Sequence, residues 1–151
     1  MHEELPQIER ELMLLGRHAA MAALRRDQPE DRLERSAYTL LTRLRTQGPM
    51  SIGQLAEAFG LDASTVNRQT AALLRAGLAE RIPDPDGGVA RKLRVTAEGV
   101  RRLELDRDWA IAGLARVLTD WTDAEVAELS RVLTRLNTSI EHTEARPWPR
   151  L

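Results

Sequence analysis

Apolar residues recur at steps of three and four along several stretches of the chain, a spacing that predicts amphipathic α-helices. The first helix is predicted over residues 4–25, and Pro29 separates it from a second helix that ends at Gly48 and Pro49. The apolar positions of these two helices are Leu5, Ile8, Leu12, Leu15, Ala19 and Ala22, followed by Leu33, Ala37, Leu40, Leu41 and Leu44.

A helix-turn-helix is predicted over residues 54–77. Ser51 and Gln54 form the capping-box pattern that begins a short helix, with its buried side at Ile52, Leu55, Ala56 and Phe59. Ala56 is small enough for a second helix to approach, Gly60 can adopt the left-handed backbone of a turn, and Val66 anchors the next helix. That next helix is predicted over residues 63–77.

The pattern changes after Gly77, where two short strands flank the turn-rich segment PDPDGGVA. The strands cover residues 78–82 and 91–95. Apolar and basic side chains alternate in the second strand, which places them on opposite faces. The apolar pair is Leu93 and Val95, and the basic pair is Lys92 and Arg94.

Two further helices complete the chain. Thr96 is placed to cap the first of them, and Thr122 with Glu125 forms a second capping box at the start of the last. The order of elements predicts a mainly α fold, a winged helix-turn-helix of about six helices plus a two-stranded β wing, with additional N- and C-terminal helices.

Composition narrows the function classes. The chain has 151 residues, a net charge of −1 and no cysteine, which excludes disulfides, thiolate ligands and a cysteine redox switch. Its three histidines lie far apart, and no HExxH, GxSxG or phosphate-loop pattern is present, so we expect no enzyme, cofactor or metal site. The N-terminus is acidic and no apolar run approaches the ~20 residues of a membrane span, so we expect a cytoplasmic protein without membrane contact.

The fourth predicted helix is polar over its first two turns and apolar beyond them. Its polar positions are Ser64, Thr65, Asn67, Arg68 and Gln69, and its packing positions are Val66, Thr70, Leu73 and Leu74. In a recognition helix these turns enter the major groove, where Asn and Gln pair with adenine and Arg with guanine. Ser64 and Thr65 suit phosphate contacts. The alternative is a solvated helix start at which Asp62 and Ser64 serve only as caps.

The chain resembles the MarR family of winged-helix transcription regulators over nearly its whole length. The positions that carry the resemblance are Gly48-Pro49, Leu55-Ala56, Ser64-Thr65-Val66, Arg68, Leu73, Gly77-Leu78, Arg81, Asp84-Pro85, Thr96 and Gly99. The resemblance implies a homodimeric repressor that binds pseudo-palindromic double-stranded DNA and is released by a small aromatic or anionic effector.

The wing departs from the family pattern. The resemblance implies an arginine at the wing tip, but Gly87, Gly88 and Val89 stand there. Either Arg91 reaches the minor groove instead, or the wing contacts only phosphates through Lys92 and Arg94. Between residues 62 and 94 the basic residues exceed the acidic ones by only six to four, which predicts weak nonspecific binding.

The terminal helices carry more apolar residues than a small winged helix needs. A two-fold dimer would double the DNA contacts, so we predict dimerisation helices within residues 1–32 and 97–151 around a DNA-binding domain at 33–96. The predicted interface is Leu5, Ile8, Leu12, Leu129, Leu133, Leu136 and Ile140. An intrachain helical core is the alternative. Trp148 either caps the interface or lies in a frayed end.

An effector crevice is implied by the resemblance, and its candidate lining is His18, Arg35, Tyr38 and Trp109. The alternative is that Tyr38 and Trp109 are ordinary core aromatics. Two other functions remain open: a winged helix that binds protein with little DNA affinity, and a small-molecule carrier built on the same helices.

Overall fold

The computed structural model describes residues 2–18 and 33–150. Within these ranges it has six helices and a two-stranded antiparallel sheet, which confirms the predicted fold class. The elements are α1 (Leu5–His18), α2 (Arg35–Gln47), α3 (Ile52–Phe59), α4 (Ala63–Arg75), β1 (Ala79–Ile82), β2 (Lys92–Val95), α5 (Ala97–Val117) and α6 (Asp123–Glu144). The rest of the first predicted helix, including Ala19 and Ala22, lies outside the described residues, as does Pro29.

The core joins α2, α3, α4, the wing and α5. Leu41, Leu55 and Val66 have no exposed surface, and burial of each such side chain contributes ~1.5–3 kcal/mol. The other buried apolar residues are Leu33, Leu40, Leu44, Met50, Leu73, Leu78, Ala79, Leu93 and Leu103. The winged helix is therefore built around one leucine-rich core.

The helix-turn-helix forms as its sequence predicts. The Ser51 hydroxyl accepts from the backbone N–H of Gln54 at 3.1 Å, and the Gln54 side chain accepts from the N–H of Ser51 at 2.9 Å. Gly60 has φ of 63°, the left-handed backbone that glycine adopts without strain. This turn lets the N–H of Leu61 bond the Ala56 carbonyl at 3.0 Å and directs the chain into α4.

The wing pairs β1 with β2 so that Glu80 lies opposite Arg94 and Ile82 opposite Lys92. Successive residues of a strand point to opposite faces, so Lys92 and Arg94 lie on one face of β2 and the buried Leu93 lies on the other. This confirms the predicted alternation.

The junction between the wing and α5 is tightly packed. Thr96 accepts from the N–H of Gly99 at 3.0 Å, as predicted for an N-cap, and its hydroxyl donates to the Gly77 carbonyl at 2.7 Å. A Cβ atom added to Gly99 would lie 2.1 Å from the carbonyl oxygen of Leu78. Only glycine therefore lets α5 start this close to the wing.

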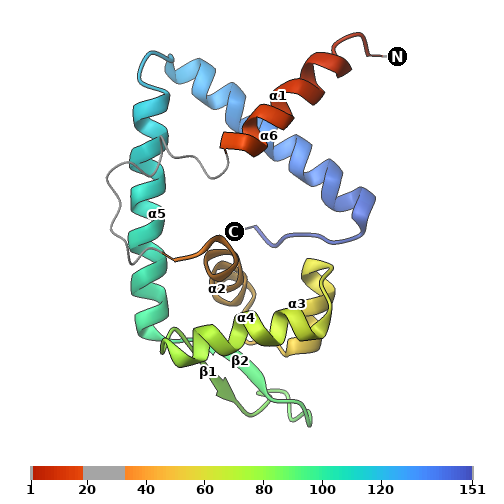
Figure 1. Cartoon of the computed structure of the whole chain (residues 1–151), viewed down its shortest axis with the longest axis vertical. Helices are drawn as coiled ribbons and strands as arrows, with labels where there is room; N and C mark the ends of the chain where they lie inside the picture. The colour runs from red at the N-terminus through yellow and green to blue at the C-terminus, as the bar shows by residue number, and fades with distance from the viewer. Residues whose placement is uncertain (1, 19–32, 151) are drawn as a thin grey trace.

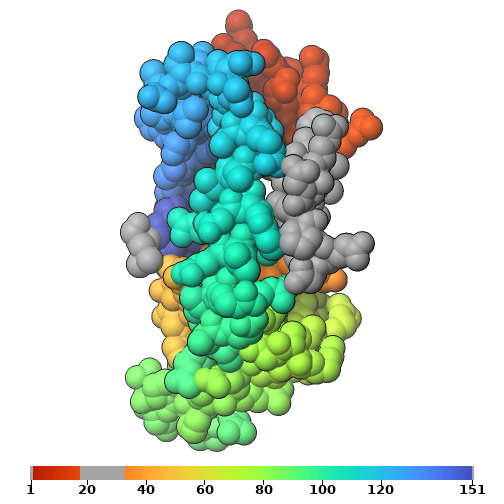
Figure 2. Space-filling view, turned by 90° about the vertical axis from the view of Figure 1, so that its left-hand side faces the viewer, coloured from red at the N-terminus to blue at the C-terminus, as the bar shows by residue number. Residues whose placement is uncertain are grey.

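Two ends of the molecule are joined by α5. The helices α1 and α6 lie at one end, and α3, α4 and the wing lie toward the other (Figure 1). The space-filling view shows α5 as a column that runs between them (Figure 2). The predicted capping box opens α6, with the N–H of Glu125 donating to the Thr122 hydroxyl at 3.2 Å. Of the helices described, none is long and apolar enough to cross a membrane.

Candidate nucleic-acid interface

The core side chains of α4 leave one helix face exposed. Val66, Thr70 and Leu73 are buried, and the Thr70 hydroxyl donates to the Val66 carbonyl at 2.8 Å within the helix. The exposed polar residues of the helix are Ser64, Asn67, Arg68 and Arg75. The apolar half thus fixes α4 to the core, and the outer face carries amide and guanidinium groups.

Asp62, directly before α4, binds two hydroxyls that the sequence assigns to phosphates. Ser64 donates to one carboxylate oxygen at 2.7 Å, and Thr65 donates to the other. The hydrogen bonds from Thr65 and then Ser64 hold the pKa of the Asp62 carboxyl below its usual value. Asp62 is the N-cap residue of α4, and its side chain binds the two hydroxyls instead of the backbone of the helix.

Gln69 lies at the edge of the outer face rather than on it. It is half-buried and lines a pocket of about 380 Å³ with Ser36 and Leu40 of α2 and with Phe59 and Leu61. Asn67 and Arg68 are exposed, so these two are better placed than Gln69 to meet a partner outside the chain.

The basic residues of the wing differ in their partners. Arg94 pairs with Glu80 across the strands, and the Lys92 ammonium lies 3.4 Å from the Asp84 carboxylate, with both side chains of that pair only 13% exposed. Arg91 is exposed and has no ion-pair or hydrogen-bond partner among the described residues. Among the three candidates Arg91, Lys92 and Arg94, Arg91 is therefore the one whose charge is not paired with a carboxylate of a described residue.

Arg75 belongs to the same outer face but is not among the sequence candidates. It follows Ser64 by eleven residues and Arg68 by seven, spacings that return to one side of a helix. Arg75 is exposed near the end of α4. Helical periodicity applied to the whole helix, rather than to its first two turns, would have found it.

The effector candidates do not share one described pocket. Arg35 lines the same pocket as Gln69, whereas Tyr38 is half-buried against the core and Trp109 is half-buried on α5. The side chain of His18 lies outside the described part of the structure. Within that part, no group of acidic or histidine side chains could hold a metal ion.

The interface candidates lie on the terminal helices. Leu5, Ile8 and Leu12 are 46–49% exposed, Leu133 and Ile140 are 39% and 46% exposed, and Leu129 and Leu136 are half-buried. The sequence candidates omit further exposed apolar side chains, among them Met13, Leu15, Ile111, Leu114 and Val117. The whole of α6 is described, and it contains no buried residue.

A helix-turn-helix followed directly by a two-stranded wing defines a winged helix-turn-helix protein. The family model that matches residues 33–87 is that of the MarR family. An uncharacterised HTH-type transcriptional regulator of Bacillus subtilis (strain 168), YxaD, is 37% identical over 114 residues, which make up 74% of this chain and 80% of YxaD. The chain belongs to the MarR family, whose members are transcriptional regulators rather than enzymes.

Solved structures share the fold over most of the chain. A MarR family protein from Bacillus stearothermophilus matches with a TM-score of 0.78 at 22% identity, over 93% of this chain and 98% of its own. The PcaV transcriptional regulator from Streptomyces coelicolor, solved in complex with its natural ligand, matches with a TM-score of 0.61 at 22% identity, over 89% and 92% of the two chains.

Proposed function

We propose that the protein is a cytoplasmic, homodimeric repressor that binds a pseudo-palindromic DNA operator with α4 of each protomer in the major groove. The observation that carries this proposal is the outer face of α4, where Asn67, Arg68 and Arg75 are exposed while the opposite face is anchored in the core. Asn67 and Arg68 read base edges, and Arg75 contacts phosphate. Arg91 supplies an unpaired positive charge at the wing for a DNA phosphate.

Dimerisation is supported by the apolar surface of the terminal helices. Exposed leucine, isoleucine and valine side chains gather on α1, on the second half of α5 and on α6. A contiguous apolar surface on a soluble protein marks an interaction site. A two-fold pair would present two recognition helices to half-sites about one DNA turn apart. Residues 1–32 and 97–151 are accordingly proposed to form the dimer, and residues 33–96 to bind DNA.

Selection of bound duplexes from random DNA, followed by titration at several salt concentrations, tests the proposal. We expect one enriched palindromic sequence, a dimer in sedimentation, and an affinity that falls steeply as salt rises, because bound phosphates release counterions. Absence of an enriched sequence would contradict the DNA-binding function.

The pairing of Lys92 with Asp84 and of Arg94 with Glu80 favours a second candidate function, a winged helix that binds protein. This alternative predicts weak DNA retention with little sequence preference. The same selection experiment separates the two, since it would then enrich no duplex while the protein remains folded.

Release by a small molecule is also part of the proposal. PcaV has a natural ligand. In this chain the pocket beside Arg35 and Gln69 lies between α2 and the helix-turn-helix, with a mainly apolar lining. A small aromatic carboxylate would place its ring on the apolar wall and its charge at Arg35. A rise in melting temperature with such compounds, lost in Arg35→Ala, tests this assignment.

A further inference from the structure

The segment after α6 folds back onto the helix-turn-helix. The Trp148 ring meets the Phe59 ring edge to face, with centroids 5.7 Å apart and an angle of 69° between the planes. The guanidinium carbon of Arg43 lies 5.1 Å from the centroid of the Trp148 ring, and Arg43 is only 7% exposed. Both contacts are of stabilising types. The prediction of a frayed end is therefore wrong.

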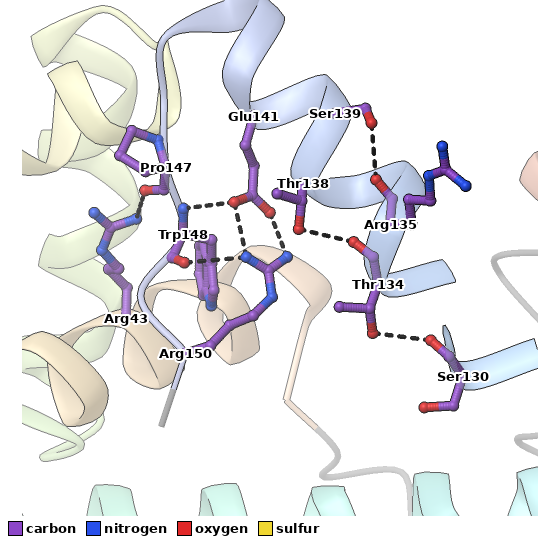
Figure 3. Close-up of polar contacts among 10 residues, drawn as sticks. All are labelled: Arg43, Ser130, Thr134, Arg135, Thr138, Ser139, Glu141, Pro147, Trp148 and Arg150. Carbon is purple, nitrogen blue, oxygen red and sulfur yellow. Dashed lines mark hydrogen bonds and ion pairs between the residues drawn. The ribbon is translucent and has the colours of Figure 1, made fainter. Parts of the chain in front are cut away.

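Glu141 near the end of α6 holds this fold-back. Its carboxylate accepts from the N–H of Trp148 at 3.0 Å and from two guanidinium nitrogens of Arg150, one of them at 2.8 Å (Figure 3). The Arg150 hydrogen bond, followed by that of the Trp148 N–H, lowers the pKa of Glu141 to about 2. The carboxylate thus stays ionised at neutral pH.

Two hydrogen bonds from arginine side chains to backbone carbonyls complete the attachment of this segment to the winged helix. Arg146 donates to the carbonyl of Glu57, in the last turn of α3, at 3.3 Å. Arg43 of α2 donates to the Pro147 carbonyl at 3.4 Å. Residues 145–150, which we call the tail, therefore contact both α2 and α3.

The tail is a second connection between the terminal helices and the winged module. The first is α5, which packs on α2 and is fixed to the wing through Thr96 and Gly99. In Figure 1 the tail comes from the end of α6 on the side of α3, across the molecule from α5. A module held on one side alone can pivot about that side. Attachment on two sides restrains α3 and, through the turn at Gly60, α4.

We propose that Trp148 is a positioning residue for DNA binding, which acts by fixing the angle between the helix-turn-helix and α6. This inference rests on the proposed function, because it concerns the separation of two recognition helices in a DNA-binding dimer. A fixed separation suits one spacing of half-sites and penalises others.

The test compares wild type, Trp148→Ala and Trp148→Phe on three duplexes: the operator selected with wild-type protein, the same operator with one base pair inserted at its centre, and a single half-site. Trp148→Ala should bind the operator about tenfold more weakly, as expected when an aromatic pair and a cation–π contact are lost. It should lose much less affinity on insertion than wild type does, and its half-site affinity should not change. Trp148→Phe should restore most of the spacing preference.

A uniform loss on all three duplexes, or an unchanged penalty for the insertion, would overturn the inference, because a residue that only stabilises the fold changes the active fraction equally. Melting curves establish folding. If Trp148→Ala does not fold, the double substitution Glu141→Gln with Arg150→Gln releases the fold-back without touching the core, and the same comparison decides.

A second readout requires no DNA. The chain has no cysteine, so Ala72→Cys on the exposed side of α4 gives one spin-label site per protomer. Trp148→Ala should broaden the distribution of label distances in the dimer. An unchanged distribution would contradict the proposal that Trp148 fixes the angle between the helix-turn-helix and α6. Failure of wild type to select any duplex would instead contradict the proposed function. The distance measurement would then still test whether Trp148 fixes the position of the helix-turn-helix.

Discussion

The recognition helix carries two basic residues and the wing four, but their charges are not equally available. In α4, Arg68 and Arg75 are exposed and form no ion pair with any described residue. In β2, Arg94 pairs with Glu80, and Lys92 pairs with Asp84. Arg91, just before β2, and Arg81 in β1 are exposed and form no ion pair with any described residue, so these two are comparable to the arginines of α4.

A count of basic residues therefore does not measure the positive charge that is available to DNA. The pair of Arg94 with Glu80 is exposed, and exposed ion pairs contribute only ~0–1 kcal/mol, so a phosphate can compete for this arginine. The phosphate must nevertheless also approach the negatively charged carboxylate of Glu80, which repels it. We therefore expect α4 to supply most of the sequence-specific affinity, and the wing a small and mainly nonspecific part.

The largest effect is expected for Arg68→Ala. Loss of a bidentate contact to guanine costs ~1–3 kcal/mol, or about 5- to 150-fold in affinity for the selected operator, with a much smaller loss on unrelated DNA. Arg116→Ala, on the exposed last turn of α5, removes the same charge far from α4 and serves as the control. Equal losses for the two variants in a titration would contradict the comparison.

A smaller effect is expected for Arg91→Ala. Because this side chain is assigned to phosphate, affinity should fall by a similar factor on every sequence, and the salt dependence should weaken by about one ion. Measurement of binding at several salt concentrations gives both quantities. A change of sequence preference in this variant would show instead that the wing reads bases.

Glu80→Gln tests the role of ion pairing in the wing, because it removes the partner of Arg94. We expect affinity to rise by less than about fivefold and salt dependence to increase, in keeping with the small energy of exposed pairs. Glu128→Gln in α6 breaks an equivalent pair with Arg131 away from the wing and should have no effect on DNA binding. A loss of affinity in Glu80→Gln would indicate that the pair orders the wing for binding.

The smallest effect concerns the pKa of Asp62. Since two hydroxyls lower this pKa in the folded protein, their contribution to stability is complete above the ordinary value of 3.8 and is lost as pH falls through the folded value. Ser64→Ala with Thr65→Val should raise the pKa toward 3.8 in an NMR titration of the carboxyl carbon. No movement of the pKa would show that the hydroxyls do not bind Asp62 in solution.

Sequence reasoning succeeded where the interactions are local. The capping boxes at Ser51 and Thr122, the left-handed Gly60 and the alternation along β2 each depend on residues a few positions apart. These features fix the order of elements, and with it the winged helix.

The remaining features depend on contacts between distant residues. The pair of Arg94 with Glu80 follows from the strand register, which the length of the wing loop sets. The contact of Arg43 with Pro147 joins residues 104 positions apart, and no local pattern around Trp148 indicates that its ring lies on Phe59. The bonds of Ser64 and Thr65 to Asp62 are local and could have been anticipated from the preference of Asp for neighbouring donors.

The most direct test of the recognition helix is methylation interference at guanine N7, an atom that faces the major groove. On the selected operator, the account predicts that methylation of one guanine in each half-site blocks wild-type protein, and that Arg68→Ala no longer responds to methylation at that position. Identical interference patterns for the two proteins, or no interference from any guanine N7 in the operator, would contradict the assignment of α4 to the major groove.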